Sequence, residues 1–227
     1  MTDFALDALD LAALLCSRVC HDVISPVGAI VNGLEVLEEE KDAEMRGFAL
    51  DLIKKSAATA SARLQFCRLA FGAAGSAGAS IDTGDAEKVA RGLFADQRTQ
   101  LEWRAARVLM PKDKVKLILN LCLIAAAAIP RGGVITVTTG EAGDNPSGHG
   151  LRVKVSAKGA NAKLASQVPN LLAGNPDGNP VDAQGIQPFY AGLVAKAANM
   201  ALTVTLESDL VAIEALSVVP ATVKVVA

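Results

Sequence analysis

Aromatic residues, histidine and cysteine are all scarce in this sequence of 227 residues. Aromatics make up 4% of the chain, and only two histidines and four cysteines occur. No Cys-x-x-Cys pair is present, and the histidines are too few to complete a zinc site beside Cys16 and Cys20, so we expect no metal centre. All four cysteines stand in apolar helical patterns, which predicts buried, reduced thiols.

The chain also has no large excess of positive or negative charge and no long apolar run. The 22 basic and 24 acidic residues give a net charge of −2, which leaves no basic surface for nucleic acid. The longest apolar run, residues 115–129, is shorter than the roughly 20 residues that a membrane span needs. The segment MTDFALDALDLAALL contains three aspartates and no basic residue, unlike a signal peptide. We therefore expect a soluble, cytoplasmic protein with neither a membrane nor nucleic acid as its partner.

Two long amphipathic helices are predicted in the first third of the chain. Apolar residues recur at helical spacing over residues 6–40 and again over residues 43–71, with a short turn around Asp42 between them. Helices joined by so short a turn pack antiparallel, but a single hairpin cannot bury both apolar stripes. We therefore expect two copies of the hairpin to form a four-helix bundle, so that the protein is a homodimer.

A glycine- and alanine-rich stretch, GAAGSAGAS, separates this hairpin from a segment of different pattern. Beyond it, alternating apolar residues predict strands and longer apolar periods predict helices. The predicted helices are 84–96, 112–129, 163–172 and 189–198, and the predicted strands are 100–104, 134–140, 151–157 and 202–208, with a last strand or two in the tail. The sequence thus predicts an α+β protein, with a helical hairpin at 1–73, a linker at 74–81 and an α/β sandwich at 82–227.

The segment RVCHDVISPVGAI places His21 inside the first predicted helix. A neutral imidazole is a nucleophile near neutral pH and can accept a phosphoryl group where it is exposed on a rigid element. Arg18 and Ser25 share its helix face, where Arg18 can attract an anion. Asp22 can fix the tautomer of the ring, and Pro26 bends the helix after this site. The alternative interpretation is an exposed histidine without a function.

The residues CHDVISPVGAI resemble the phosphoacceptor box of sensor histidine kinases, in which His and an acidic residue are followed, after two residues, by Thr or Asn and then Pro. His21, Asp22 and Pro26 match this box. Ser25 replaces the Thr or Asn, and Ile24 stands where kinases usually have Arg. A helical hairpin, a linker and an α/β domain also follow the kinase order, so the resemblance covers nearly the whole chain. It implies a phosphoacceptor role for His21 and the fold of the kinase ATPase domain for the second half.

The nucleotide-binding positions of the kinases are largely replaced. The Asn that holds Mg²⁺ in kinases falls on Ile124, and the Asp of the Asp-x-Gly-x-Gly box falls on Ala157. Only Gly159 remains of the glycines of that box, and only Gly192 of the later glycine-rich box. We therefore expect the fold of an ATPase domain without ATP, a metal or any other cofactor.

A phosphoacceptor hairpin beside a domain without ATP chemistry resembles the ChpT-type histidine phosphotransferases of alphaproteobacterial cell-cycle relays. The resemblance implies a homodimer that takes a phosphoryl group from the receiver domain of a hybrid histidine kinase and passes it, through His21, to response regulators. Mg²⁺ would come with the receivers. The expected docking residues lie on both helices of the hairpin: Ser25, Pro26, Val27, Gly28, Val31, Asn32, Gln65 and Arg68. A packing role between the two helices would explain Gly28 as well as a docking role does.

Three other functions remain open at this point. The first is an ATP-dependent kinase, which the replaced nucleotide positions argue against. The second is a dimeric scaffold that binds receivers without chemistry, so that His21 has no part. The third is a phosphatase for response regulators, in which Asp22 and Ser25 orient a water molecule.

Overall fold

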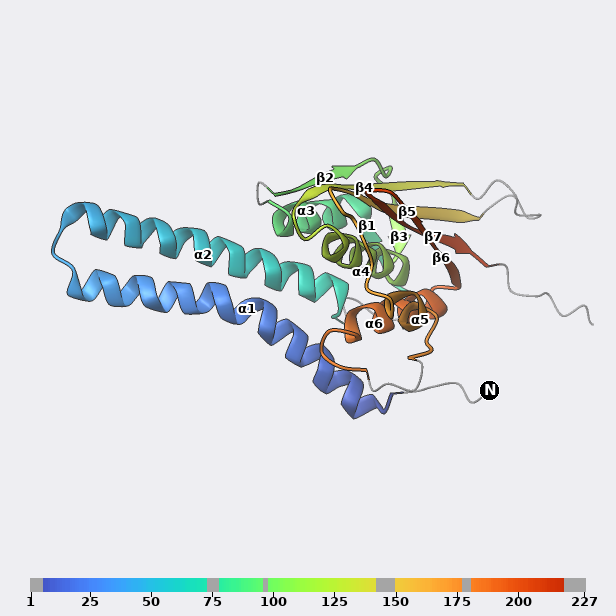
Figure 1. Ribbon diagram of the computed structural model, residues 1–227, viewed down its shortest axis with the longest axis horizontal. Coiled ribbons are helices and arrows are strands. Elements are labelled where there is room, and N and C mark those ends of the chain that lie inside the picture. Colours follow the sequence, from blue (N-terminus) through green and yellow to red (C-terminus); the bar gives the residue numbers. More distant parts are fainter. Residues whose placement is uncertain (1–5, 73–77, 96–97, 142–149, 177–180, 219–227) are drawn as a thin grey trace, which may run out of the picture.

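The computed structural model describes residues 6–72, 78–95, 98–141, 150–176 and 181–218, so His149 and the end of the tail lie outside it. Within these residues, a long helical hairpin extends from a body of strands and shorter helices (Figure 1). The hairpin consists of α1 (Ala8–Glu39) and α2 (Ala43–Ala70). The carboxylates of Asp7 and Asp42 accept backbone N–H groups of the first turns and so cap the two helices. The predicted α+β fold with an N-terminal hairpin is confirmed.

The hairpin buries few of its side chains. In α1, which is described throughout, only Pro26 and Gly33 are buried. The helices approach closely at Gly33, because a Cβ there would lie 2.7 Å from Ile53 Cγ1 and 3.3 Å from the carbonyl oxygen of Ala49. The buried residues of α2 are Ala49, Ser56, Ala60, Phe66, Cys67 and Ala70. Most of the apolar surface of the hairpin therefore stays exposed.

The N-terminal half of α1 bends away from α2 toward α5 (Val168–Leu172) and α6 (Ile186–Ala197) (Figure 1). Pro26, inside α1, removes a backbone hydrogen bond, which is the usual cause of such a bend. Four leucines before the bend pack against a small cluster of the body: Leu6, Leu11, Leu14 and Leu15 against Leu171, Val181, Ile186 and Phe189. The body thus holds the N-terminal half of α1.

The main sheet has five strands in the order β2-β4-β5-β7-β6. β2 runs parallel to β4, and the other neighbours are antiparallel. Its strands are β2 (Thr99–Trp103), β4 (Gly133–Glu141), β5 (Leu151–Lys158), β6 (Met200–Glu207) and β7 (Leu210–Ser217). A small second sheet pairs β1 (Ser80–Asp82) with β3 (Leu109–Pro111). Helices α3 (Thr83–Leu93), α4 (Lys112–Ala128) and α6 lie beneath the main sheet (Figure 1).

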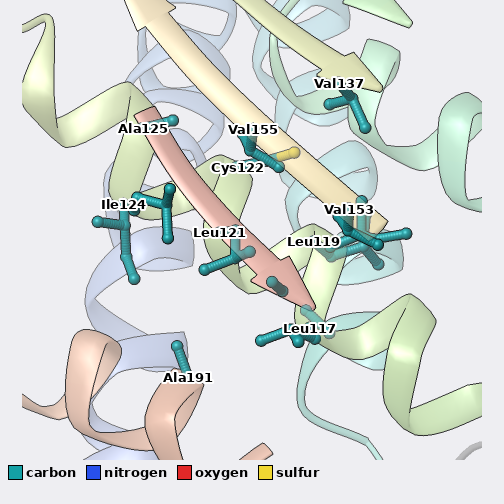
Figure 2. Packing of buried hydrophobic residues seen from close by; sticks show 14 of the residues in the cluster. Leu117, Leu119, Leu121, Cys122, Ile124, Ala125, Val137, Val153, Val155 and Ala191 are labelled. Atoms are coloured by element: carbon teal, nitrogen blue, oxygen red, sulfur yellow. The ribbon is translucent and has the colours of Figure 1, made fainter. Parts of the chain in front are cut away.

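α4 forms the centre of the core between the sheet and the other helices. Figure 2 shows its Leu119 and Cys122 beside Val153 and Val155 of β5. Every second residue of β5 from Val153 to Ala157 is buried, as expected for a strand with one face on a core. The apolar helix predicted over 112–129 is therefore confirmed as a core helix.

The short elements differ from the predictions. The three-residue strands β1 and β3 are not predicted, and β1 overlaps the end of the predicted linker. α5 begins at Val168 rather than 163, because Pro169 fits only the first turn of a helix and so marks its start. α6 begins at Ile186, before the predicted 189, with Pro188 again in the first turn. Residues 219–227, where another strand was possible, are outside the described chain.

Candidate functional site

His21 presents its imidazole to solvent in the N-terminal half of α1. Its side chain is 85% exposed, and its Nδ1 lies 3.4 Å from Oδ1 of Asp22. Asp22 also accepts a hydrogen bond from Arg18, with 3.1 Å between Nε and Oδ2. A proton on Nδ1 directed at Asp22 leaves the lone pair of Nε2 free to attack an electrophile from solution. The three residues thus form an exposed nucleophile with charged neighbours.

α2 contributes a residue that the sequence analysis did not identify. Pro26 has no backbone N–H, so the carbonyl group of Asp22, four residues earlier, has no partner within the helix. Arg63 supplies that partner, because its Nη1 donates a hydrogen bond to the Asp22 carbonyl oxygen. The one signal in the sequence is the proline itself, which leaves a carbonyl unpaired but does not say which residue binds it.

Two of the four cysteines, Cys67 and Cys122, are buried. Burial raises the pKa of the Cys67 thiol to about 11, and the Asp22 carboxylate adds to the increase. Burial also raises the pKa of Cys122, to about 12. Both thiols therefore stay neutral near neutral pH. Cys16 and Cys20 are exposed, so the prediction of burial is wrong for these two, because they lie on a face of α1 that no other described element covers.

The predicted docking residues of α1 divide between two faces of the helix. At 3.6 residues per turn, Ser25, Gly28 and Asn32 return to the face of His21. Ser25 and Asn32 are exposed. A Cβ at Gly28 would meet no atom within 4 Å, so this glycine has no packing role within the hairpin. These four residues form an open and mostly polar surface, called here the His21 strip.

Val27 and Val31 belong to a second face, together with Ile24 and Leu34. These four residues form what we call the apolar strip, with exposed fractions between 44% for Val27 and 70% for Ile24. The apolar strip lies roughly a quarter of a turn around the helix from the His21 strip. Pro26 is buried and cannot offer its ring to a partner, which corrects its assignment as a docking residue.

Gln65 and Arg68 are exposed on α2 and line a groove of about 630 Å³. The groove runs between α2, α3 and the small sheet, and its lining includes Asp82, Asp85 and Lys88. Its walls thus carry charges of both signs. The structure places Gln65 and Arg68 at the junction of the hairpin with the body, not on the His21 strip.

The positions that match the nucleotide boxes of kinases have packing roles in this protein. Ile124 and Ala157 belong to the core and are 3% and 0% exposed. A Cβ at Gly159 or at Gly192 would lie 2.6 Å or 2.3 Å from a backbone oxygen of a neighbouring segment. Close backbone packing therefore accounts for both of the remaining glycines.

A cavity of about 180 Å³ lies between α1, α4 and α6, lined in part by Arg18, Ile124, Lys163 and Gln187. Sites for small molecules commonly measure about 300–1,000 Å³. The cavity is small for a nucleoside triphosphate, and Ile124 offers a hydrocarbon side chain where kinases hold Mg²⁺.

Two buried amides connect the helices next to this cavity. Gln187 Nε2 donates to Asn120 Oδ1 at 2.6 Å. Asn120 Nδ2 donates in turn to the carbonyl oxygens of Ala70, at 3.0 Å, and Lys116, at 2.8 Å. Because Ala70 is the last residue of α2, this chain of hydrogen bonds ties the end of the hairpin to α4 and α6.

Known proteins of similar sequence and structure identify the family. Residues 83–209 match the family described as histidine phosphotransferase C-terminal domain. The chain is 50% identical over 199 residues to protein phosphotransferase ChpT of Brucella abortus (strain 2308), across 88% of this chain and 91% of that protein. A solved structure of a bacterial phosphotransferase is 44% identical, with a TM-score of 0.82 over 94% of this chain and 98% of that one.

The histidine kinase AdeS of Acinetobacter baumannii is a more distant match, with 10% identity and a TM-score of 0.47 over 87% of this chain and 96% of that one. Half of the aligned residues are identical between this chain and the Brucella abortus phosphotransferase, over most of both chains. The family profile also covers more than half of the sequence. The chain therefore belongs to the histidine phosphotransferase family.

Proposed function

We propose that the protein is the histidine phosphotransferase of a multistep phosphorelay. In this role His21 takes a phosphoryl group from the receiver domain of a hybrid histidine kinase and passes it to response regulators that control the cell cycle. The observation that carries the proposal is the 85% exposed imidazole, whose Nδ1 faces Asp22 on a rigid helix. Membership of the family and a relative named as a phosphotransferase support it.

In the proposed reaction, Nε2 of His21 attacks the phosphorus of a receiver phosphoaspartate. The N–P bond forms as the bond from phosphorus to the aspartate oxygen breaks, and the receiver carboxylate leaves with the electron pair. Asp22 holds the ring proton on Nδ1 and stabilises the positive charge that develops on the imidazole. Arg18 adds positive charge beside the incoming oxygens. Transfer to the next receiver is the same step in reverse, and the receivers supply Mg²⁺.

Exposed apolar residues support a homodimer in which two hairpins form a four-helix bundle. The apolar strip of α1 is uncovered, and on α2 the residues Met45, Phe48 and Leu52 are 47%, 61% and 44% exposed. Bundles bury such surfaces between their helices. Val27 and Val31 are therefore assigned to the dimer, whereas Ser25, Gly28 and Asn32 are assigned to receiver docking beside His21.

α1 is the one described helix that is long and apolar enough to cross a membrane by length and composition. A second hairpin over the apolar strip accounts for that composition without a membrane. Asp10, Arg18 and Asp22 also lie within α1, and charged groups are costly in a lipid core. We therefore propose that the protein is cytoplasmic.

The proposal includes no ATP-dependent step. The cavity of about 180 Å³ and its hydrocarbon residue Ile124 support this. The retained glycines are explained by packing, so they give no reason to expect a triphosphate. The phosphoryl group would come only from a receiver.

A three-component transfer assay tests the proposal. A receiver domain radiolabelled on its aspartate is mixed with the protein and with a second, unlabelled receiver, and His21→Ala is run in parallel. We expect label on the wild-type protein and then on the second receiver. We expect no label on His21→Ala and none passed on by it, because no other described residue offers an exposed imidazole.

The same assay distinguishes the other functions. Label taken up from ATP alone would identify a kinase. Label that reaches the second receiver equally well with His21→Ala would leave the protein as a scaffold. Release of the label as inorganic phosphate, abolished by Ser25→Ala, would identify a phosphatase.

A further inference from the structure

Arg63 forms a contact at the phosphoacceptor that the proposed chemistry does not use. It lies on α2, is partly buried, and donates a hydrogen bond from Nη1 to the backbone carbonyl of Asp22. Asp22 directly follows His21 in the chain. The bond therefore holds the peptide group next to the residue that carries the reactive ring.

The need for this bond follows from Pro26. In an unbroken α-helix the N–H of residue 26 would bond the carbonyl of residue 22, and proline has no N–H. A partly buried carbonyl without a donor is unfavourable, and the helix can open at that point. Arg63 supplies the missing donor from the facing helix, with a charged group whose hydrogen bonds are stronger than those of a neutral amide. The bend at Pro26 therefore does not release the segment that bears His21.

Two arginines from two helices thus fix one residue. Arg18 of α1 binds the carboxylate of Asp22 at 3.1 Å, and Arg63 of α2 binds its carbonyl oxygen. The remaining carboxylate oxygen lies 3.4 Å from Nδ1 of His21. The main chain and the side chain of Asp22 are both held, and Asp22 is the group that faces the imidazole.

We propose that Arg63 is a positioning residue for phosphotransfer. By binding the Asp22 carbonyl it fixes the direction in which His21 leaves α1 and keeps Asp22 opposite Nδ1. This inference rests on the proposed function of His21 and extends it to the second helix. Arg63 acts through Asp22 and does not touch the phosphoryl group.

The first test compares Arg63→Ala with Arg46→Ala in the transfer assay. Arg46 is a matched control, because it also lies on α2 and donates to backbone carbonyls of Leu37 and Glu40, but at the far end of the hairpin. We expect Arg63→Ala to lower kcat about tenfold, with the KM for the phosphorylated receiver changed less than about twofold. Arg46→Ala should leave both unchanged, and equal losses in the two variants would overturn the proposal.

Pro26→Ala gives a more specific test. Alanine restores the N–H that binds the Asp22 carbonyl, so Arg63 is no longer needed for that purpose. We expect Arg63→Ala, added to Pro26→Ala, to change kcat less than about twofold relative to Pro26→Ala alone. The proposal fails if the loss is the same with and without the proline. Arg63→Lys keeps a donor and should recover most of the wild-type kcat.

The nitrogen NMR spectrum of the His21 ring provides a test without any receiver. The second histidine, His149, serves as an internal reference. We expect Arg63→Ala to move the ring proton from Nδ1 toward Nε2, and Arg46→Ala to leave it in place. An unchanged ring would overturn the positioning role, whereas a wild-type protein that accepts no phosphoryl group would overturn only the proposed function. If Arg63→Ala does not fold, the transfer assay and the nitrogen NMR spectrum are measured on Arg63→Lys and on the double variant Pro26→Ala/Arg63→Ala.

Discussion

Gly28 and Gly33 lie in the same helix but meet opposite surroundings. A Cβ at Gly33 would lie 2.7 Å from Ile53 Cγ1, whereas a Cβ at Gly28 would meet nothing within 4 Å. Both glycines have the same disadvantage in a helix relative to alanine, because glycine loses more conformational freedom on folding. The contact with α2 is therefore what distinguishes the two positions.

We expect alanine to have effects of opposite sign at these positions. Gly33→Ala should lower the free energy of unfolding by about 1–2 kcal/mol, because overpacking against Ile53 exceeds the gain in helix propensity. Gly28→Ala should raise it by about 0.5–1 kcal/mol. Urea unfolding at one fixed protein concentration measures both changes. Changes of the same sign and size would contradict the close approach of the helices at Gly33.

The residues of the site differ in how far the sequence could reveal them. His21, Asp22 and Arg18 could be predicted together, because they are neighbours in the chain or one helix turn apart. Arg63 could not, since its contact with Asp22 spans 41 residues and depends on how α1 and α2 are aligned. Pro26 could be predicted as the cause of a bend, but its burial depends on the packing of the hairpin.

At the scale of elements, the N-terminus of α3 is capped by the carboxylate of Asp82, which has two hydrogen-bond partners. Oδ1 of Asp82 accepts a hydrogen bond from the Gly84 N–H at 2.7 Å, and Nε of Arg107 lies 3.1 and 3.0 Å from the two carboxylate oxygens. Two hydrogen bonds lower the pKa of the Asp82 carboxyl: the one from Arg107 has the larger effect, and the one from the Gly84 N–H has the smaller. A carboxyl whose pKa is lower in the folded state adds stability above its unfolded pKa, and this stability is lost as the pH falls through the folded pKa.

Asp82→Asn tests this contribution. Asparagine is also a good N-cap, so the variant keeps an acceptor for the Gly84 N–H and loses only the charge. We expect it to be less stable than the wild type at neutral pH, and the difference to shrink as the pH falls from about 5 to about 2. Urea unfolding across this range measures the difference. A difference that does not change with pH would show that Asp82 acts only as an uncharged cap.

The length of an element decides how well the sequence predicts it. α1, α2 and α4 repeat an apolar pattern over several turns, β5 alternates over its whole length, and β4 and β6 alternate over their central residues, so the pattern identifies them. β1 and β3 contain three residues each and exist because they pair with one another. Three residues hold no period, and their pairing is a property of the folded chain.

At the scale of the whole molecule, buried amides join the hairpin to the body. Asn120 is 0% exposed and Gln187 is 4% exposed, and their hydrogen bonds run from α6 through α4 to the last carbonyl of α2. The sequence shows Asn120 as the polar exception in an apolar helix, but not its partners, which lie 50 and 67 residues away. Such a chain orients the hairpin relative to the body more narrowly than apolar contacts alone.

Asn120→Leu should therefore destabilise the protein strongly. It leaves the Ala70 carbonyl and the amide of Gln187 without these partners, and we expect the free energy of unfolding to fall by about 2–4 kcal/mol. The double variant Asn120→Leu/Gln187→Leu removes the unpaired amide and should recover about half of the loss. Urea unfolding compares the three proteins. A double variant no more stable than Asn120→Leu would contradict the pairing of the two amides.

The exposure of His21 bears on how long a signal can last. In the proposed relay, a phosphoryl group on a side chain that is 85% exposed has no shelter from water. Its lifetime on this protein is then set by ordinary hydrolysis and by how soon the next receiver arrives. The protein would then pass the phosphoryl group on without prolonging the signal itself. The duration of a response would depend on the concentrations of the receivers that donate and accept the phosphoryl group.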